Sequence, residues 1–354
     1  MKETTFRGRK AIEIEDESVR LTTVVEGGHI AEFLEKSTGI NPLWAPPWPT
    51  MEPSAYCADG NPEYGADAES KLLSGILGHN LCLDYFGGPS PEEFAAGLTV
   101  HGEASVVAYD FSPVPGGWSA RAHMPIAMLN LERSVELMPG GVVRIREEIE
   151  NLSAMDRPLG WTQHVTLGPP FIEHGRTRFH LPVGKSMTYP VKLGPAQTVK
   201  VAAEFDWPLA PAEDGGTEDL RVYTSAPSSA LVTGHLVREE YRHGYFLAWH
   251  PGSKLAVGYL WYRKDYPWIA IWDENHSRFN PPWNGNTLTR GLEFGVSPWA
   301  EGRRAMVDRG TLFGERVYRW IPARSRISAE YLAFVRVMDA LPAEVPEDVR
   351  RLLP

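Results

Sequence analysis

The sequence predicts an all-β protein, a large antiparallel β-sandwich with a few short helices. The 354 residues include 30 prolines and 33 glycines. These residues recur between short apolar segments, which is typical of many turns rather than of long helices. Along most of those segments apolar and polar residues alternate with a period of two. No linker interrupts the segments, so we expect one domain over residues 1–354.

The clearest alternation lies in residues 142–150. Val143, Ile145 and Ile149 fall on one side of this segment, and charged residues fall on the other. Similar patterns predict further strands at Val19–Glu26, Ser105–Tyr109, Met128–Leu137, Leu231–His235, Tyr245–Trp249, Lys254–Tyr262, Pro267–Trp272 and Ile327–Val337. Strands are therefore expected almost from end to end.

Helical signals are few and short. Ser90 is suited to cap a helix that begins at Pro91, and residues 346–353 resemble a terminal helix. Residues 41–65 carry six prolines among Trp44, Trp48 and two tyrosines. A buried strand cannot hold that many prolines, so this segment is expected to be an excursion from the sheet.

Composition and charge exclude several classes of function. Lys and Arg number 35 against 45 Asp and Glu, and the basic residues form no stripe, so nucleic acid is not an expected partner. No run of 18 apolar residues predicts a membrane span, and the first ten residues lack the apolar core of a secretory signal. We expect a cytoplasmic protein with no membrane partner, in which Cys57 and Cys82 are free thiols.

The pattern of polar residues points to a sugar. The sequence has no phosphate-binding glycine loop, no dinucleotide fingerprint and no serine-hydrolase elbow. It has instead histidines and acids set among aromatic residues. Such a mixture suits a sugar site, because the ring C–H faces stack on aromatic side chains while the hydroxyls need charged or amide partners.

Four segments occur in an order that is informative. They are Gly27-Gly28-His29-Ile30-Ala31-Glu32-Phe33, Leu98-Thr99-Val100-His101-Gly102, Asn151-Leu152-Ser153 followed by Pro158 and His164, and Arg290-Gly291-Leu292-Glu293-Phe294-Gly295. Together they resemble the successive signatures of the galactose mutarotase-like (aldose 1-epimerase) family over most of the chain. The resemblance implies the family's supersandwich fold and an isomerase that interconverts sugar anomers and needs no cofactor.

The resemblance also implies roles for three residues. Glu293 matches the general base that acts on the anomeric hydroxyl, and His164 matches the acid at the ring oxygen. His101 matches a second histidine that holds and polarises the same part of the sugar. Each has an ordinary alternative: Glu293 pointing to solvent by strand alternation, His164 a hydrogen-bonded interior residue, and His101 a turn residue beside Gly102.

Five further residues are candidates for binding the sugar. His79 and Asp84 lie in an otherwise apolar segment, where polar groups are costly unless they face a pocket or satisfy each other. Trp272 and Glu274 belong to a polar cluster that follows a strand of aromatic residues, and Trp48 belongs to the proline-rich excursion. An ordinary solvated turn is the alternative for Trp272 and Glu274.

The identity of the substrate stays open. The classical sugar mutarotases have an arginine ahead of the first site histidine and an aspartate between the second histidine and the glutamate, and neither maps onto this sequence. We expect a monosaccharide or sugar derivative as ligand, no metal, and a monomer or homodimer. Two other functions remain: a non-catalytic sugar-binding protein on the same scaffold, and a metal-dependent isomerase or lyase that uses His79, Asp84, His101 and His164.

Overall fold

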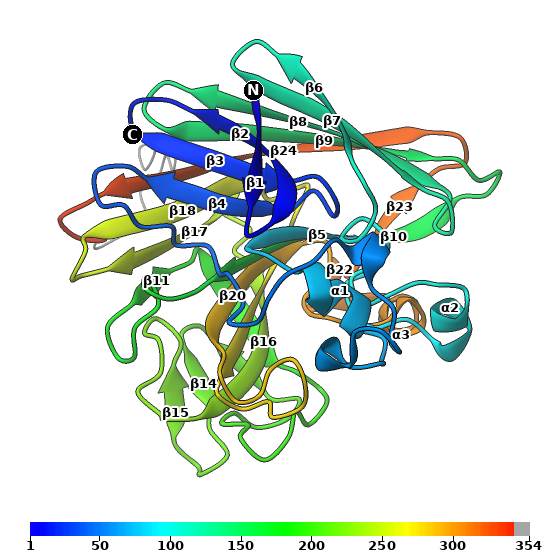
Figure 1. The fold of residues 1–354 in the computed structure, drawn as a ribbon. Helices are drawn as coiled ribbons and strands as arrows, with labels where there is room; N and C mark the ends of the chain where they lie inside the picture. Colours follow the sequence, from blue (N-terminus) through cyan, green and yellow to red (C-terminus); the bar gives the residue numbers. More distant parts are fainter. Residues whose placement is uncertain (343–354) are drawn as a thin grey trace.

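The computed structural model describes residues 1–342 and confirms the all-β prediction (Figure 1). All ladders between its named strands are antiparallel, and two large sheets account for most of them. The first sheet has the order β1 (Lys2–Phe6), β2 (Arg9–Glu15), β3 (Val19–Val24), β4 (Ile30–Glu35), β5 (His79–Asp84), β10 (Arg157–Leu167), β20 (Leu288–Gly295), β19 (Trp268–Asn275), β16 (Ser229–Val237), β12 (Val183–Thr188) and β13 (Glu204–Asp206), and β23 (Arg319–Ile321) pairs with the beginning of β10.

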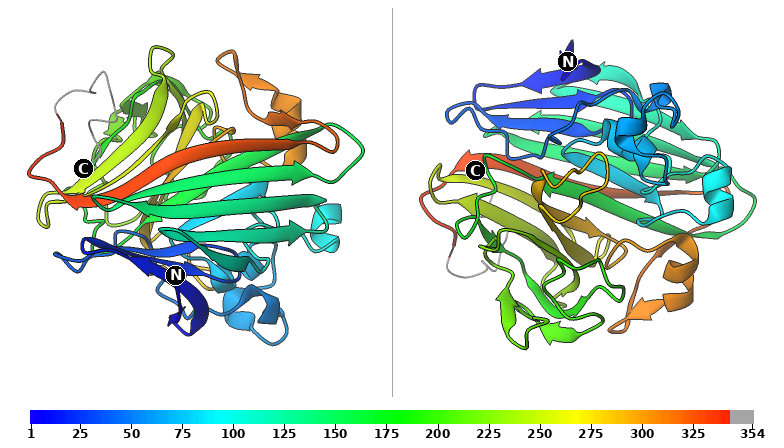
Figure 2. Two further views of the ribbon diagram at one scale, coloured as in Figure 1. Left: turned by 90° about the horizontal axis from the view of Figure 1, so that it is seen from above. Right: turned by 60° about the horizontal axis from the view of Figure 1, so that its bottom comes forward.

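The second sheet covers one face of the first. Its order is β11 (Arg178–His180), β17 (His243–His250), β18 (Leu255–Tyr262), β24 (Arg326–Val337), β9 (Val142–Asn151), β8 (Leu129–Met138), β7 (Gly117–Met124) and β6 (Asp110–Val114). Figure 2 shows β24, β9, β8 and β7 running side by side in this layer. Two small hairpins join β14 (Leu209–Pro211) to β15 (Thr217–Asp219) and β21 (Thr311–Leu312) to β22 (Glu315–Arg316).

The helices are short, as expected. They are α1 (Ser70–Gly75), α2 (Pro91–Ala95), α3 (Arg303–Arg309) and the 3-10 turns η1 (Pro53–Ala55) and η2 (Pro62–Tyr64). Figure 1 shows α1, α2 and α3 near β5 and β10, on the side away from the second sheet. No helix among the described residues is long and apolar enough to cross a membrane.

One hydrophobic core joins the two large sheets. Leu81 of β5 and Val165 of β10 belong to the same buried cluster as Val135 of β8 and Ile145 of β9. Inward-facing residues that alternate along each strand fill the space between two packed sheets in this way. The opposite face of the first sheet is left for other side chains, and the candidate site lies there.

Most of the predicted elements are confirmed, and one is wrong. The strands predicted at 19–26, 128–137, 142–150, 231–235, 245–249, 254–262, 267–272 and 327–337 match β3, β8, β9, β16, β17, β18, β19 and β24. Residues 105–109 form no strand: the N–H groups of Val106 and Val107 both donate to the carbonyl of Glu103 in a turn, and Ala108 makes only an isolated bridge with Glu26. Five residues are too few for alternation to separate a strand from a buried turn.

The predictions for the helix at Pro91, the excursion and the cysteines also stand. The Ser90 hydroxyl accepts the N–H of Glu93, and the Glu93 carboxylate accepts the N–H of Ser90, so α2 begins with a capping box. Residues 41–65 form no strand and contain η1 and η2. Cys57 and Cys82 are free. The helix predicted at 346–353 lies outside the described residues.

Candidate functional site

A cavity of about 190 Å³ lies over the middle of the first sheet. Four of the predicted site residues line it: His101, His164, Trp272 and Glu293. The other lining residues are Glu69, Leu72, Leu73, Ile76, Phe86, Val100, Tyr189, Leu193, Val232, Arg278, Trp283 and Ala300. A larger hollow of about 340 Å³ over strands of the second sheet is lined mainly by charged residues and contains none of the predicted site residues.

Strand register brings the central polar groups of the cavity together. His164 of β10 stands opposite Asn80 of β5 on one side and opposite Glu293 of β20 on the other. Residues directly opposite each other in antiparallel strands have side chains on the same face of the sheet. Asn80, His164 and Glu293 therefore form a row across three neighbouring strands, and all three are buried.

His164 and Glu293 are in direct contact. Nε2 of His164 lies 2.9 Å from Oε1 of Glu293, and Nδ1 of His164 lies 3.0 Å from the hydroxyl of Thr166. The contact with Glu293 has the distance of a hydrogen bond without its alignment, and Oε1 has no hydrogen-bond partner in the described part of the chain. A buried carboxylate oxygen without a hydrogen-bond partner is costly, and Glu293 is at the same time one of the residues that line the cavity.

Gly291 makes room for the Glu293 carboxylate. It precedes Glu293 by two residues in β20, on the same face of the strand. A Cβ atom at residue 291 would lie 2.2 Å from Oε1 of Glu293, which is closer than any real contact. This steric demand accounts for the glycine in the Arg290–Gly295 segment.

A tight turn places His101 above the row. The residue has φ 68°, its N–H donates to the carbonyl of Gly87, and its carbonyl accepts the N–H of Leu83. Gly102 follows with φ 76°, where a Cβ atom would lie 2.1 Å from the carbonyl oxygen of Leu83. The left-handed backbone and this close approach fix the turn, so the imidazole centroids of His101 and His164 lie 4.6 Å apart.

His101 is a neutral imidazole near pH 7. Burial, followed by repulsion from His164 and His29 when they are charged, holds the pKa of His101 well below its ordinary value. Nδ1 of His101 lies 3.2 Å from the side-chain amide of Asn80. A neutral imidazole offers one donor and one acceptor, so this contact bears on which nitrogen carries the proton.

Aromatic rings and an ion pair form the rim of the cavity. The Arg278 guanidinium lies 4.6 Å from the centre of the Trp283 ring, and its Nη1 lies 3.2 Å from Oε2 of Glu69. The indole N–H of Trp283 donates to the other oxygen of Glu69, and the rings of Trp272 and Trp283 meet edge to face. Glu69, Arg278 and Trp283 are not among the site residues predicted from the sequence. Arg278 and Trp283 lie in the polar, proline-containing stretch that follows residues 273–276, and this stretch is the feature of the sequence that could have indicated them.

Trp48 and Glu274 lie just behind the cavity wall. The indole N–H of Trp48 donates to the carbonyl of Leu73, and its ring packs edge to face on Trp283, so Trp48 supports that residue without lining the cavity. The Glu274 carboxylate accepts bonds from the hydroxyl and N–H of Ser277 and from the N–H of Arg278. Glu274 thus holds the turn that presents Arg278.

His79 faces the interior between the sheets. Its two ring nitrogens contact the side chains of Gln163 and Tyr259, and burial lowers its pKa to about 3. In the part of the chain that the structure describes, no group of three or more histidine, cysteine, aspartate or glutamate side chains is placed to hold a metal. His79 therefore does not converge with His101 and His164, as a metal site would require.

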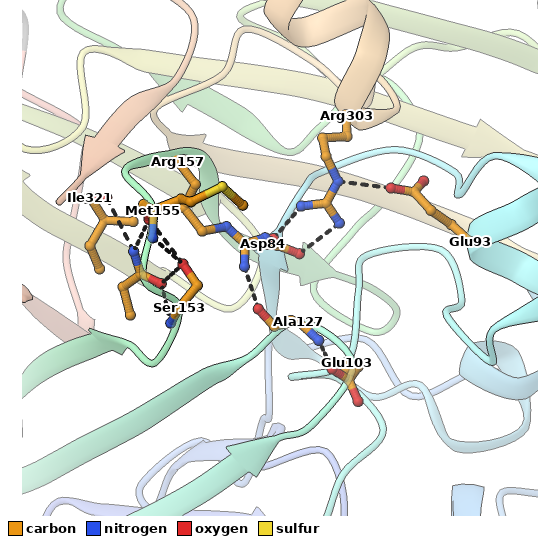
Figure 3. Close-up of polar contacts among 10 residues, drawn as sticks. Asp84, Glu93, Glu103, Ala127, Ser153, Met155, Arg157, Arg303 and Ile321 are labelled. Carbon is orange, nitrogen blue, oxygen red and sulfur yellow. Dashed lines mark hydrogen bonds and ion pairs between the residues drawn. The ribbon is translucent and has the colours of Figure 1, made fainter. Parts of the chain in front are cut away.

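Asp84 belongs to a buried ion cluster at the end of β5 (Figure 3). Its carboxylate pairs with Arg157 of β10 and Arg303 of α3, and Arg303 also bonds Glu93. Burial, and then the nearby charge of Arg303, lower the pKa of Arg157 to about 10. This cluster ties β5, β10, α2 and α3 together, and Asp84 does not line the cavity.

Comparison with known proteins relates the chain to others through its fold. Neither a protein-family model nor a curated protein matches the sequence. A candidate aldose 1-epimerase from Klebsiella pneumoniae superposes with a TM-score of 0.65 at 13% identity, over 93% of this chain and 79% of that one. A candidate aldose 1-epimerase from Escherichia coli K12 gives 0.63 at 10% identity, over 93% and 99% of the two chains. A galactose mutarotase-like protein from Clostridium acetobutylicum gives 0.60 at 12% identity, over 95% and 98%. The chain thus has the galactose mutarotase-like fold that the order of its four sequence segments implies.

Proposed function

We propose that the protein is an aldose 1-epimerase-like isomerase that interconverts the anomers of a monosaccharide, with Glu293 as base and His164 as acid. The observation that carries this proposal is the 2.9 Å contact between Nε2 of His164 and Oε1 of Glu293 inside an aromatic-walled cavity. Glu293 lines the cavity, and no group among residues 1–342 donates a hydrogen bond to its Oε1; both observations support a role for this carboxylate in taking up a proton from a ligand.

The spacing suits the reaction because both oxygens that exchange protons are bonded to the anomeric carbon. Glu293 takes the proton of the anomeric hydroxyl while His164 gives a proton to the ring oxygen. The bond between the ring oxygen and C1 breaks, which leaves an aldehyde and a free hydroxyl. After rotation about C1–C2 the hydroxyl attacks the other face of the aldehyde. His164 then recovers its proton, and Glu293 returns its own to the new anomeric hydroxyl.

The rest of the cavity supports a sugar as ligand. Its volume of about 190 Å³ lies below the ~300 Å³ at which pockets for drug-sized molecules begin. Trp272 and Trp283 offer ring faces for C–H stacking, and the Glu69–Arg278 pair offers an acceptor and donors for hydroxyls. Arg278 and Glu69 are our candidates for the sugar contacts that the family's arginine and aspartate supply elsewhere.

The test is the approach to anomeric equilibrium. Freshly dissolved α-aldoses, in a panel of hexoses, pentoses and acidic sugars, are followed by polarimetry with the wild type and with Glu293→Gln. We expect the wild type to accelerate exchange on at least one sugar and Glu293→Gln to leave only the spontaneous rate, while the variant still folds. A Gln variant with wild-type activity refutes the role of Glu293. Binding of a sugar without any acceleration by the wild type would favour the non-catalytic alternative.

A further inference from the structure

Asn80 is the only member of the central row for which the proposed reaction has no role. Oδ1 of Asn80 lies 3.2 Å from Nδ1 of His101 and 3.2 Å from the hydroxyl oxygen of Ser105. Its other terminal atom, Nδ2, is buried and has no partner within the described residues. In this orientation two amide hydrogens are buried without an acceptor, which is an expensive arrangement.

The hydroxyl of Ser105 decides the orientation of the amide. This hydroxyl has one proton, and it lies 2.7 Å from the carbonyl oxygen of Leu81, which can only accept. The lone pairs of Ser105 therefore face Asn80. A half-turn of the amide exchanges its oxygen and nitrogen and puts N–H groups toward Ser105 and His101, while the buried atom without a partner becomes a carbonyl oxygen. Both donors are then satisfied.

We propose that Asn80 is a positioning residue, whose amide N–H donates to Nδ1 of His101 and thereby keeps the proton of the neutral imidazole on Nε2. Nδ1 cannot carry a proton while it accepts a hydrogen bond from the amide of Asn80. The low pKa of His101 agrees with a ring that holds a single proton.

The consequence for the cavity rests on the proposed function. Nε2 of His101 has no hydrogen-bond partner in the described chain, and His101 lines the cavity. With its proton on Nε2, His101 presents a donor to a sugar oxygen. With the proton on Nδ1, it would present only an acceptor. A donor aimed at the ring oxygen stabilises the charge that develops there when the ring opens, which is the polarising role that the resemblance assigns to His101.

The protonation of each ring nitrogen can be measured by long-range ¹H–¹⁵N NMR on ¹⁵N-labelled protein, with His101 assigned through a His101→Gln variant. We expect His101 to show a protonated Nε2 and an unprotonated Nδ1. His29 supplies an internal reference, because the N–H of Leu77 donates to its Nδ1 and its Nε2 donates to the carbonyl of Ser105. It must show the same tautomer.

The substitution Asn80→Asp tests the cause. A carboxylate only accepts, so Nδ1 of His101 should become protonated in this variant, and the turnover number on an accelerated sugar should fall about 100-fold, the scale for losing one donor in an active site. Asn130→Asp is the matched control, since the side-chain oxygen of Asn130 contacts Nδ1 of the exposed His123 on the second sheet while its amide nitrogen donates to Glu150. It should leave His101 and the turnover number unchanged.

Two results would overturn the inference: a wild-type His101 with its proton on Nδ1, or an Asn80→Asp variant whose Nδ1 stays unprotonated. The wild-type spectrum decides the first even if the variant fails to fold. Failure of the wild type to accelerate any sugar would refute the proposed function and leave the tautomer measurement standing, so the two failures are distinguishable.

Discussion

Gly291 lies so close to Glu293 that a methyl group on residue 291 would overlap the carboxylate, with 2.2 Å between the added carbon and Oε1. The glycine lies in the middle of β20, where the missing side chain weakens a strand. The space that the carboxylate occupies explains the glycine, because the three atoms nearest to an added Cβ all belong to Glu293. The strand thus gives up some stability to position one acid.

Gly291→Ala should reduce anomer exchange at least 100-fold, the lower range for the loss of one acid–base group, since the carboxylate must leave its position beside His164. Thermal unfolding should change little, because alanine is the better strand residue by about 0.5–1 kcal/mol and the displaced group is a side-chain end. Gly88→Ala is the control, since a Cβ atom there meets nothing within 4 Å. Full activity in Gly291→Ala would show that the Glu293 carboxylate is not used where the structure places it.

The rim pair should act on binding more than on turnover. Arg278→Gln is expected to raise the KM for an accelerated sugar about 10-fold, because one hydrogen bond to a charged group contributes roughly 1.5–3 kcal/mol. The turnover number should stay within about a factor of two, since the reacting groups His164 and Glu293 lie across the floor of the cavity. Arg304→Gln, an exposed change on α3, serves as control in the same steady-state assay. An unchanged KM in Arg278→Gln would remove this residue from the binding site.

Asp84 should behave as a structural residue. Asp84→Asn leaves Arg157 and Arg303 without their shared carboxylate, and breaking a buried pair in this way costs about 3 kcal/mol in the free energy of unfolding. Urea unfolding should show that loss, while the KM of the folded enzyme stays near the wild-type value. A raised KM without a loss of stability would instead support the sugar-binding role expected from the sequence.

The sequence predicts the fold well because alternation is a local property. The long strands and the capped helix at Pro91 could be identified from residues next to each other in the chain. The single-domain assignment and the site roles stay predictions. The error at residues 105–109 arose where the alternating stretch was too short to exclude a turn.

The candidate site was harder to predict, and β5 illustrates the reason. His79 and Asn80 are neighbours, yet a strand points them to opposite faces, so that His79 contacts Gln163 in the interior and Asn80 contacts His101. The apolar residues Leu81 and Leu83 belong to the core, and applying their alternation to the whole segment would have placed His79 with them and Asn80 on the cavity face. The partners of Asp84, in contrast, come from residues 157 and 303, and no local pattern pairs them.

Buried histidines should make the fold sensitive to mild acid. Burial, with a smaller contribution from the charge of Arg290, lowers the pKa of His235 to about 3, whereas an unfolded chain has a histidine pKa of about 6.5. Between these values the unfolded chain binds a proton that the folded chain does not, so the free energy of unfolding falls as the pH falls through this window. The stabilisation is fully present above pH 6.5 and decreases by at most about 1.4 kcal/mol per pH unit below it.

His235→Gln should therefore lose less stability than the wild type between pH 7.5 and pH 5, measured by urea unfolding. The control is His123→Gln, a change at an exposed histidine, which should follow the wild type. Equal losses in all three proteins would mean that His235 is protonated in the folded state, and that its contacts with Thr233 and Ser186 do not hold it neutral.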